Sequence, residues 1–235
     1  MVGFLYICLA GPILREEGVP AVVYLPTSLI GTEKSFWTDR LARVLEKSGV
    51  NTLVEHLGGK VKRGTFGRII SPQRQLSKAI ELLKAYPYQQ IDDLLDVCEN
   101  KAGISQTSQN RTFMNWDEVR ELFGTGLISF GSHTVNHAIL TTLPIDEVQA
   151  ELVLSRQKLL AEKVVKDNIS FCYPNGNYTN DIAMLIARSG FSSAMTCDPG
   201  WNIVGENLFA LKRISLHQDI SSRKSLFAYR LAQYY

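Results

Sequence analysis

Short apolar segments that alternate with helix-like segments limit the folds open to this 235-residue chain more than any other feature. Apolar, β-branched runs bounded by turn-forming residues predict strands, and most are followed by residues with helical periodicity. The strands are predicted at residues 21–25, 127–130, 169–173, 191–196 and 211–216. This alternation is typical of a parallel α/β sheet, in which reactive side chains gather where the strands end at their carboxyl side.

The predicted helices carry start and stop signals. Asn115, with Glu118 three residues later, predicts the start of a helix, and Gly124 predicts its end. Pro144 followed by two acidic residues predicts another start. Further helices are predicted around residues 39–45, 180–189 and 221–231.

Residues 50–111 interrupt this alternation. A β-hairpin is predicted first, because Thr52 and Val54 alternate with other residues and Gly58-Gly59 follows. We expect a single domain spanning residues 1–235, in which this stretch is a mostly helical insertion without a core of its own. The hairpin, the helices and a polar loop are predicted at residues 50–70, 74–102 and 104–111, respectively.

The composition is that of an ordinary globular protein. Hydrophobic residues make up 45% and charged residues 20%, which excludes a wholly disordered, collagen-like or coiled-coil chain. The 25 basic and 23 acidic residues give a net charge of +2, so the charge does not indicate nucleic acid or an anionic membrane as a partner. No apolar segment is long enough for stable insertion across a membrane. The four cysteines lack metal-ligand spacing and predict reduced or buried thiols.

The first residues form an apolar segment with no charge before Arg15. Its length suits the core of a signal peptide, but no basic residue precedes it and no A-x-A cleavage site follows it. The alternative is a helix that packs against the sheet and ends at Glu16, Glu17 and Gly18. We expect the helix, and we leave the location open between the cytoplasm and the cell envelope.

Two of the four histidines follow a predicted strand, in the segment Gly131-Ser-His-Thr-Val-Asn-His137. Neutral imidazoles at this spacing can bind one metal ion when the segment between them is helical or tightly turned. The spacing alone is a weak signal, and a chance pairing of two structural histidines is the alternative. Their position after a strand favours a metal site at His133 and His137.

Two other predicted strands also end in candidate residues. Strand 169–173 leads into Tyr173-Pro-Asn-Gly-Asn-Tyr178, whose backbone amides can stabilise an oxyanion, although an ordinary turn is the simpler interpretation when the segment is taken alone. Strand 211–216 leads to His217, which is either a general acid or a surface histidine. His56, inside the insertion, is expected to be structural.

Several segments occur together in an order and at spacings that are more specific than any one of them. They are residues 18–21, 36–39, 116–122, 132–137, 171–178 and 211–214. Together they resemble the polysaccharide deacetylase (NodB-like) family of carbohydrate esterases. The resemblance covers about residues 20–45 and 112–222.

The resemblance implies a distorted (β/α) barrel of about seven strands. It implies a metal-dependent hydrolase that removes N-acetyl or O-acetyl groups from a poly- or oligosaccharide, with a divalent metal, usually zinc, bound by His133 and His137. It also implies that His217 donates a proton to the leaving group and that the backbone of Asn175 stabilises the oxyanion. The implied substrate contacts are Tyr173, Pro174 and Trp201.

The chain departs from the family pattern in three places. The family's Asp-Asp motif, which supplies a base and a metal ligand, aligns with residues 1–2, so we expect an N-terminally truncated chain that lacks the first strand. Cys172 stands where the family commonly has arginine. His217 matches the family's proton-donating histidine only loosely. A carboxylate from elsewhere, Asp198 or Asp219, can substitute for the missing ligand. The alternative function is an inactive carbohydrate-binding relative that has lost the Asp-Asp motif.

Overall fold

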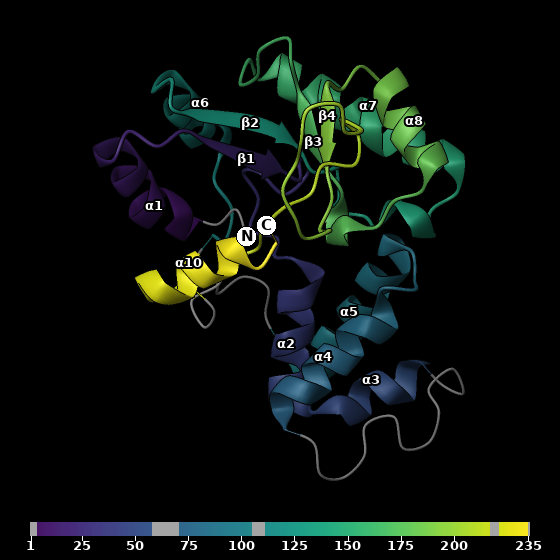
Figure 1. The fold of residues 1–235 in the computed structure, drawn as a ribbon. Helices are drawn as coiled ribbons and strands as arrows, with labels where there is room; N and C mark the ends of the chain where they lie inside the picture. Colours follow the sequence, from purple (N-terminus) through teal and green to yellow (C-terminus); the bar gives the residue numbers. More distant parts are fainter. Residues whose placement is uncertain (1–3, 58–70, 105–110, 217–220, 235) are drawn as a thin grey trace.

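The computed structural model describes residues 4–57, 71–104, 111–216 and 221–234, and Figure 1 traces the fold. One parallel sheet of four strands runs in the order β1-β2-β3-β4. The strands are β1 (Ala21–Leu25), β2 (Ile128–Ser132), β3 (Ser170–Cys172) and β4 (Ser193–Met195). The predicted parallel α/β arrangement is therefore confirmed.

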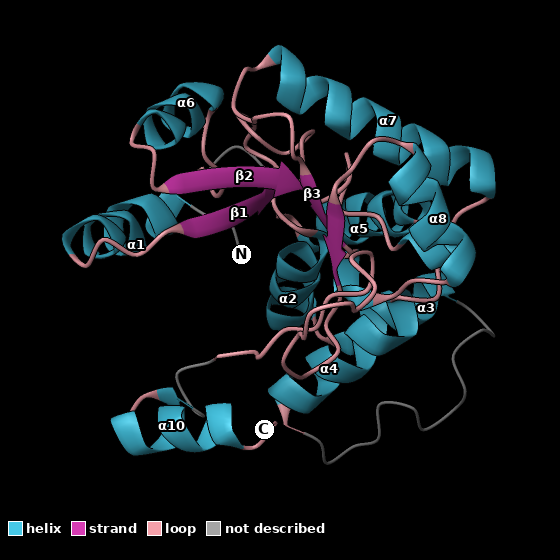
Figure 2. Cartoon of the chain, turned by 45° about the horizontal axis from the view of Figure 1, so that its top comes forward, coloured by secondary structure: helices cyan, strands magenta, loops and turns pink. Residues whose placement is uncertain are grey.

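Helices pack against this sheet. Both α6 (Trp116–Gly124) and α7 (Ile145–Ala161) contact β2, and α8 (Asn180–Arg188) contacts β4. The predicted capping signal starts α6, because Asn115 and Glu118 each accept the backbone N–H of the other. Figure 2 shows α6 beside the two longer strands, and α7 and α8 beyond β3.

The main hydrophobic core is built from the strands and these helices. It combines strand residues with Val148, Leu152 and Leu159, which form the buried stripe of α7. Its fully buried members include Leu25, Phe113, Leu140, Leu152, Leu159 and Phe171. Removal of this apolar surface from water is the principal force that holds the helices on the sheet.

The fifth predicted strand is reduced to one residue. Leu211 pairs with Met195 in a single parallel bridge, and residues 212–216 are not in a strand. The reason is local, because the Asn202 side chain accepts the backbone N–H of Lys212 and donates to its carbonyl oxygen in place of a strand partner. The described strands form an open sheet, so a barrel of about seven strands is not confirmed.

The apolar N-terminal segment forms α1 (Phe4–Glu16), as predicted. Gly18 adopts a left-handed φ of 64°. The backbone N–H groups of Gly18 and Val19 then bond to the carbonyl oxygens of Arg15 and Leu14, which ends the helix. Leu14 also packs against the main core. Within the described part of the chain, no helix has the length and apolar character needed to cross a membrane.

Four further helices form a helical lobe, which lies below the sheet in Figure 1. They are α2 (Trp37–Ser48), α3 (Val50–Leu57), α4 (Pro72–Leu83) and α5 (Tyr88–Ala102). The lobe has its own buried cluster, which includes Leu41, Val44, Leu53, Leu83, Leu95 and Cys98. The expectation of an insertion without a core is therefore wrong, and the lobe begins at α2, before residue 50.

Residues 50–57 form α3 instead of the first strand of a hairpin. Leu53 and Leu57 are buried one helical turn apart and pack into the lobe. The alternation at Thr52 and Val54 was misleading, because so short a segment matches the periods of both a strand and a helix. The rest of the predicted hairpin, residues 58–70, lies outside the described residues.

Candidate functional site

His133 directly follows β2, and two hydrogen bonds hold it there. Its backbone N–H donates to the Leu25 carbonyl oxygen of β1 at 3.0 Å. Its Nδ1 lies 2.6 Å from the carbonyl oxygen of Cys172, the last residue of β3. Because a carbonyl oxygen can only accept, Nδ1 carries the proton and Nε2 keeps its lone pair. This arrangement fixes the ring in the tautomer that can bind a metal ion through Nε2.

The ring of His137 lies against the ring of His133. The two ring centroids are 4.6 Å apart, with the ring planes at 74°. The ring of Phe36 also packs on His137, at a centroid distance of 4.7 Å. Within the described residues, the buried Nδ1 of His137 has no hydrogen-bond partner. A buried polar atom without a partner costs free energy, and such atoms often mark the place where a ligand or an ion binds.

Burial lowers the pKa of both imidazoles. Desolvation brings the pKa of His133 from 6.5 to about 4, and the hydrogen bond to Cys172 offsets only part of this change. The pKa of His137 lies well below 6.5, first through burial and then through repulsion from His133. Both rings are therefore neutral at pH 7, which is the form that binds metal ions.

The metal-free protein is expected to lose stability on mild acidification. His133 takes up a proton near pH 6.5 in the unfolded chain but only near pH 4 in the folded one, so the unfolded state binds more protons between these values. Stability from this residue is complete above pH 6.5 and is lost as the pH falls towards 4. We expect the free energy of unfolding to be about 2 kcal/mol lower at pH 5 than at pH 8 from His133 alone.

Urea unfolding at both pH values, with a chelator present, measures this loss. The His133→Asn variant should lack the part of the pH dependence that comes from this ring. An equal loss in the wild type and the variant would show that His133 is not its source.

The histidine loop, residues 133–138, has an unusual backbone. Thr134 and His137 have φ values of 67° and 59°, in the left-handed region that residues other than glycine rarely adopt. Asn175, in the turn after β3, has a φ of 58°. In the described chain, only Lys163 joins them as a residue other than glycine with positive φ. Such strain gathers at functional sites, and here it falls in both loops that the sequence singled out.

Sequence reasoning missed two residues that hold the histidine loop. Ser28, after β1, donates its backbone N–H to the Val135 carbonyl oxygen at 3.0 Å. Glu151 of α7 accepts the backbone N–H groups of Val135 and Asn136 at 2.6 and 3.1 Å. One sequence signal could have indicated Glu151. It lies three residues after the buried Val148, so it is a charged residue on the same side of α7 as the apolar stripe. No comparable signal marks Ser28.

A family model for polysaccharide deacetylases matches residues 10–194, which is more than half of the chain. The chain belongs to the polysaccharide deacetylase family. Among curated proteins, this family member is similar to YxkH of Bacillus subtilis (strain 168), with 24% identity over 118 residues. The match covers 50% of this chain and 42% of YxkH, so it spans less than half of that relative.

Solved structures that are similar to this polysaccharide deacetylase family member include two bacterial proteins. IcaB from Ammonifex degensii has a TM-score of 0.55 and 13% identity, over 97% of this chain and 69% of that chain. The BpsB deacetylase domain from Bordetella bronchiseptica has a TM-score of 0.49 and 17% identity, over 90% of this chain and 67% of that chain. At such low identity, the likeness to IcaB shows a shared fold and nothing more specific.

Two of the substrate contacts that the family resemblance implies are buried. Tyr173 is 0% exposed, and its hydroxyl donates to the Phe209 carbonyl oxygen at 2.8 Å. Its ring stacks on Tyr178 with the centroids 5.0 Å apart. Pro174 is also buried, in the short helix η4 (Pro174–Gly176). Neither side chain is open to a ligand in this structure, because the turn packs its apolar side chains into the core.

The other implied contacts have different surroundings. Asn175 is exposed, and its side-chain amide donates to the Oδ1 of Asn177 at 2.6 Å. Trp201 is 46% exposed, and its indole N–H donates to the Leu231 carbonyl oxygen of α10 (Lys224–Ala232) at 3.3 Å. Trp201 is therefore held to the C-terminal helix. His217 lies outside the described residues.

For the metal that the family resemblance implies, the described residues offer two candidate ligands, His133 and His137, but no third. In that part of the chain, no group of three or more His, Cys, Asp and Glu side chains is placed to hold an ion. Asp198, one of the two expected substitutes, is held through its backbone by Thr196 and Arg213. Asp219 and residues 1–2 lie outside the described residues. The chemistry of His133 and His137 suits two of the usual three protein ligands of such an ion, and the described residues offer no third.

Cys172, at the position of the family arginine, is a buried neutral thiol. Burial raises its pKa to about 11, although the nearby Arg213 acts against this rise. The Arg213 guanidinium also donates to the Sγ of Cys197 at 2.9 Å. An arginine from after β4 therefore supplies positive charge at this edge of the sheet.

Proposed function

We propose that this protein is a hydrolase that removes acetyl groups from an acetylated carbohydrate, with a divalent metal such as zinc bound in part by His133 and His137. Family membership supports the class of reaction. The observation that carries the proposal is the meeting of two neutral imidazoles where β2 and β3 end. This carboxyl edge is where parallel α/β sheets usually carry their chemistry.

The proposed reaction is a hydrolysis. Water adds to the acetyl carbonyl, the bond from that carbon to the sugar nitrogen or oxygen breaks, acetate leaves, and the sugar amine or hydroxyl takes a proton. A divalent ion, when bound, polarises such a carbonyl. The Cys172 carbonyl keeps the proton of His133 on Nδ1, so that Nε2 faces away from it as a lone-pair donor. Phe36 packs on the His137 ring and shields that side from water.

Two further roles are part of the proposal. The backbone of Asn175 is the proposed oxyanion donor, which its exposed, left-handed position in the turn after β3 supports. His217 is the proposed proton donor to the leaving group, on the basis of the family resemblance. A protonated leaving amine departs far more easily than an amide anion.

Acetate release from N-acetylated and O-acetylated oligosaccharides tests the function. We expect release when zinc, cobalt or manganese is added to chelator-treated protein, and none while the chelator is in excess. Release that chelation does not change would contradict the metal dependence. Oligosaccharide binding without acetate under any of these ions would instead support the carbohydrate-binding alternative.

A further inference from the structure

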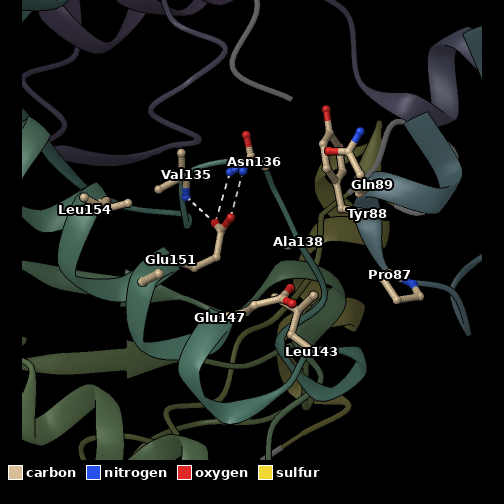
Figure 3. Close-up of a pocket in the computed structure, with 11 residues that line it drawn as sticks. Pro87, Tyr88, Gln89, Val135, Asn136, Ala138, Leu143, Glu147, Glu151 and Leu154 are labelled. Carbon is tan, nitrogen blue, oxygen red and sulfur yellow. Dashed lines mark hydrogen bonds between the residues drawn. The ribbon is translucent and has the colours of Figure 1, made fainter. Parts of the chain in front are cut away.

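The histidine loop is held from one side by α7. The Glu151 carboxylate accepts the backbone N–H groups of Val135 and Asn136 on Oε2, at 2.6 and 3.1 Å. It accepts the side-chain amide of Asn136 on Oε1 at 2.8 Å. Figure 3 shows Glu151 pointing from its helix towards these two residues. One side chain thus satisfies three donors of the loop, and hydrogen bonds to a charged acceptor are the stronger kind.

The segment after β1 holds the loop from a second direction. The backbone N–H groups of Thr27 and Ser28 donate to the carbonyl oxygens of Thr134 and Val135 at 3.1 and 3.0 Å. The Ser28 hydroxyl lies 2.9 Å from both the Val135 carbonyl oxygen and the Oδ1 of Asn136. The residues between the two histidines are therefore bonded on both sides.

These bonds lie between the two strained positions of the loop. Thr134 and His137 have left-handed backbones, and Val135 and Asn136 stand between them. A strained conformation persists only where its surroundings over-determine it. Without the carboxylate, two backbone N–H groups lose their acceptor and the loop is free to relax. The imidazole rings of His133 and His137 would then no longer be held at a fixed distance and angle to each other.

We propose that Glu151 is a positioning residue whose carboxylate holds His133 and His137 together as a pair. Only the expected effect on acetate release rests on the proposed function. The effect on the rings follows from the contacts alone. Glu151 also lines a surface pocket of about 220 Å³ between α7 and the start of α5. Truncation of Glu151 therefore enlarges an open pocket and creates no sealed void in the core.

Three variants separate positioning from folding. Glu151→Ala removes all three acceptor contacts, whereas Glu151→Gln keeps an oxygen for the two backbone N–H groups. Glu147→Ala is the matched control, because Glu147 lies one turn earlier on α7 and lines the same pocket, and it makes none of these contacts. If Glu151→Ala does not fold, Glu151→Asp replaces it, since its carboxylate is one methylene too short to reach the loop.

Nitrogen NMR of the imidazole rings, recorded on metal-free protein, is the deciding readout. The wild type, Glu151→Gln and Glu147→Ala should show His133 in the Nδ1–H tautomer. In Glu151→Ala, His133 should keep this tautomer through its bond to Cys172, whereas the ring signals of His137 at the released end of the loop should shift and broaden while thermal unfolding stays cooperative. Acetate release by Glu151→Ala should fall about 10- to 100-fold, the usual loss when a residue that orients a metal ligand is removed.

Wild-type ring signals in Glu151→Ala would overturn the proposal, and so would equal changes in Glu151→Ala and Glu147→Ala. If the wild type releases no acetate, the proposed function fails, and the ring signals still decide the role of Glu151.

Discussion

Replacing Arg40 by alanine should lower the free energy of unfolding by about 3–5 kcal/mol, the usual cost of removing one partner of a buried ion pair. Arg40 lies on α2 and is 8% exposed. Its guanidinium contacts Asp92, Asp96 and Glu99, which share one face of α5. Glu99 is only 2% exposed, so the substitution leaves a buried carboxylate without this cation. The expected consequence is loosening of the helical lobe.

Urea unfolding of Arg40→Ala measures this loss, with Arg120→Ala as the matched control. Arg120 also bonds to two carboxylates, Asp117 and Glu162, but its side chain is 44% exposed. Exposed pairs contribute roughly 0–1 kcal/mol, so the control should change little. An equal loss of unfolding free energy in the two variants would show that the ion pairs of Arg40 with α5 do not hold α2 on that helix.

Replacing Gly131 by alanine should destabilise the fold by about 3 kcal/mol, the upper end of the usual cost of overpacking. A Cβ at this position would lie 2.6 Å from the ring of Tyr24 and 2.7 Å from the carbonyl oxygen of Ser170. The Tyr24 ring can turn aside, but the Ser170 oxygen belongs to the backbone of β3 and cannot move without the strand. Because His133 lies two residues further on, the strain should also disturb the histidine pair.

Gly124→Ala is the control for this substitution. A Cβ at Gly124, the last residue of α6, would meet no atom within 4 Å. Alanine is favoured over glycine in a helix by roughly 0.5–1 kcal/mol, so this variant should be neutral or slightly more stable. Thermal unfolding of the two variants gives the comparison. A Gly131→Ala protein as stable as Gly124→Ala would mean that β2 and β3 do not pack as closely as described.

Local signals in the sequence predicted most of the α/β part. Asn115 with Glu118 started α6, and the position of His133 after a strand predicted its meeting with His137. Contacts between distant segments could not be predicted in this way. Arg40 meets carboxylates more than fifty residues away, and no spacing rule links them. The family resemblance implies a substrate contact at Tyr173, and no local signal indicates that its ring packs into the core.

Acetate release by the wild type, His133→Ala and His137→Ala tests most directly whether the imidazole pair is the reactive centre of a deacetylase. His56→Ala is the control, because His56 bonds to the Thr52 carbonyl oxygen within α3. The rate of acetate release should fall about 100-fold or more in His133→Ala and in His137→Ala, since loss of a metal ligand costs more than loss of a residue that orients one. It should be unchanged in His56→Ala. Folded His133→Ala and His137→Ala proteins that release acetate at the wild-type rate would contradict the proposed site.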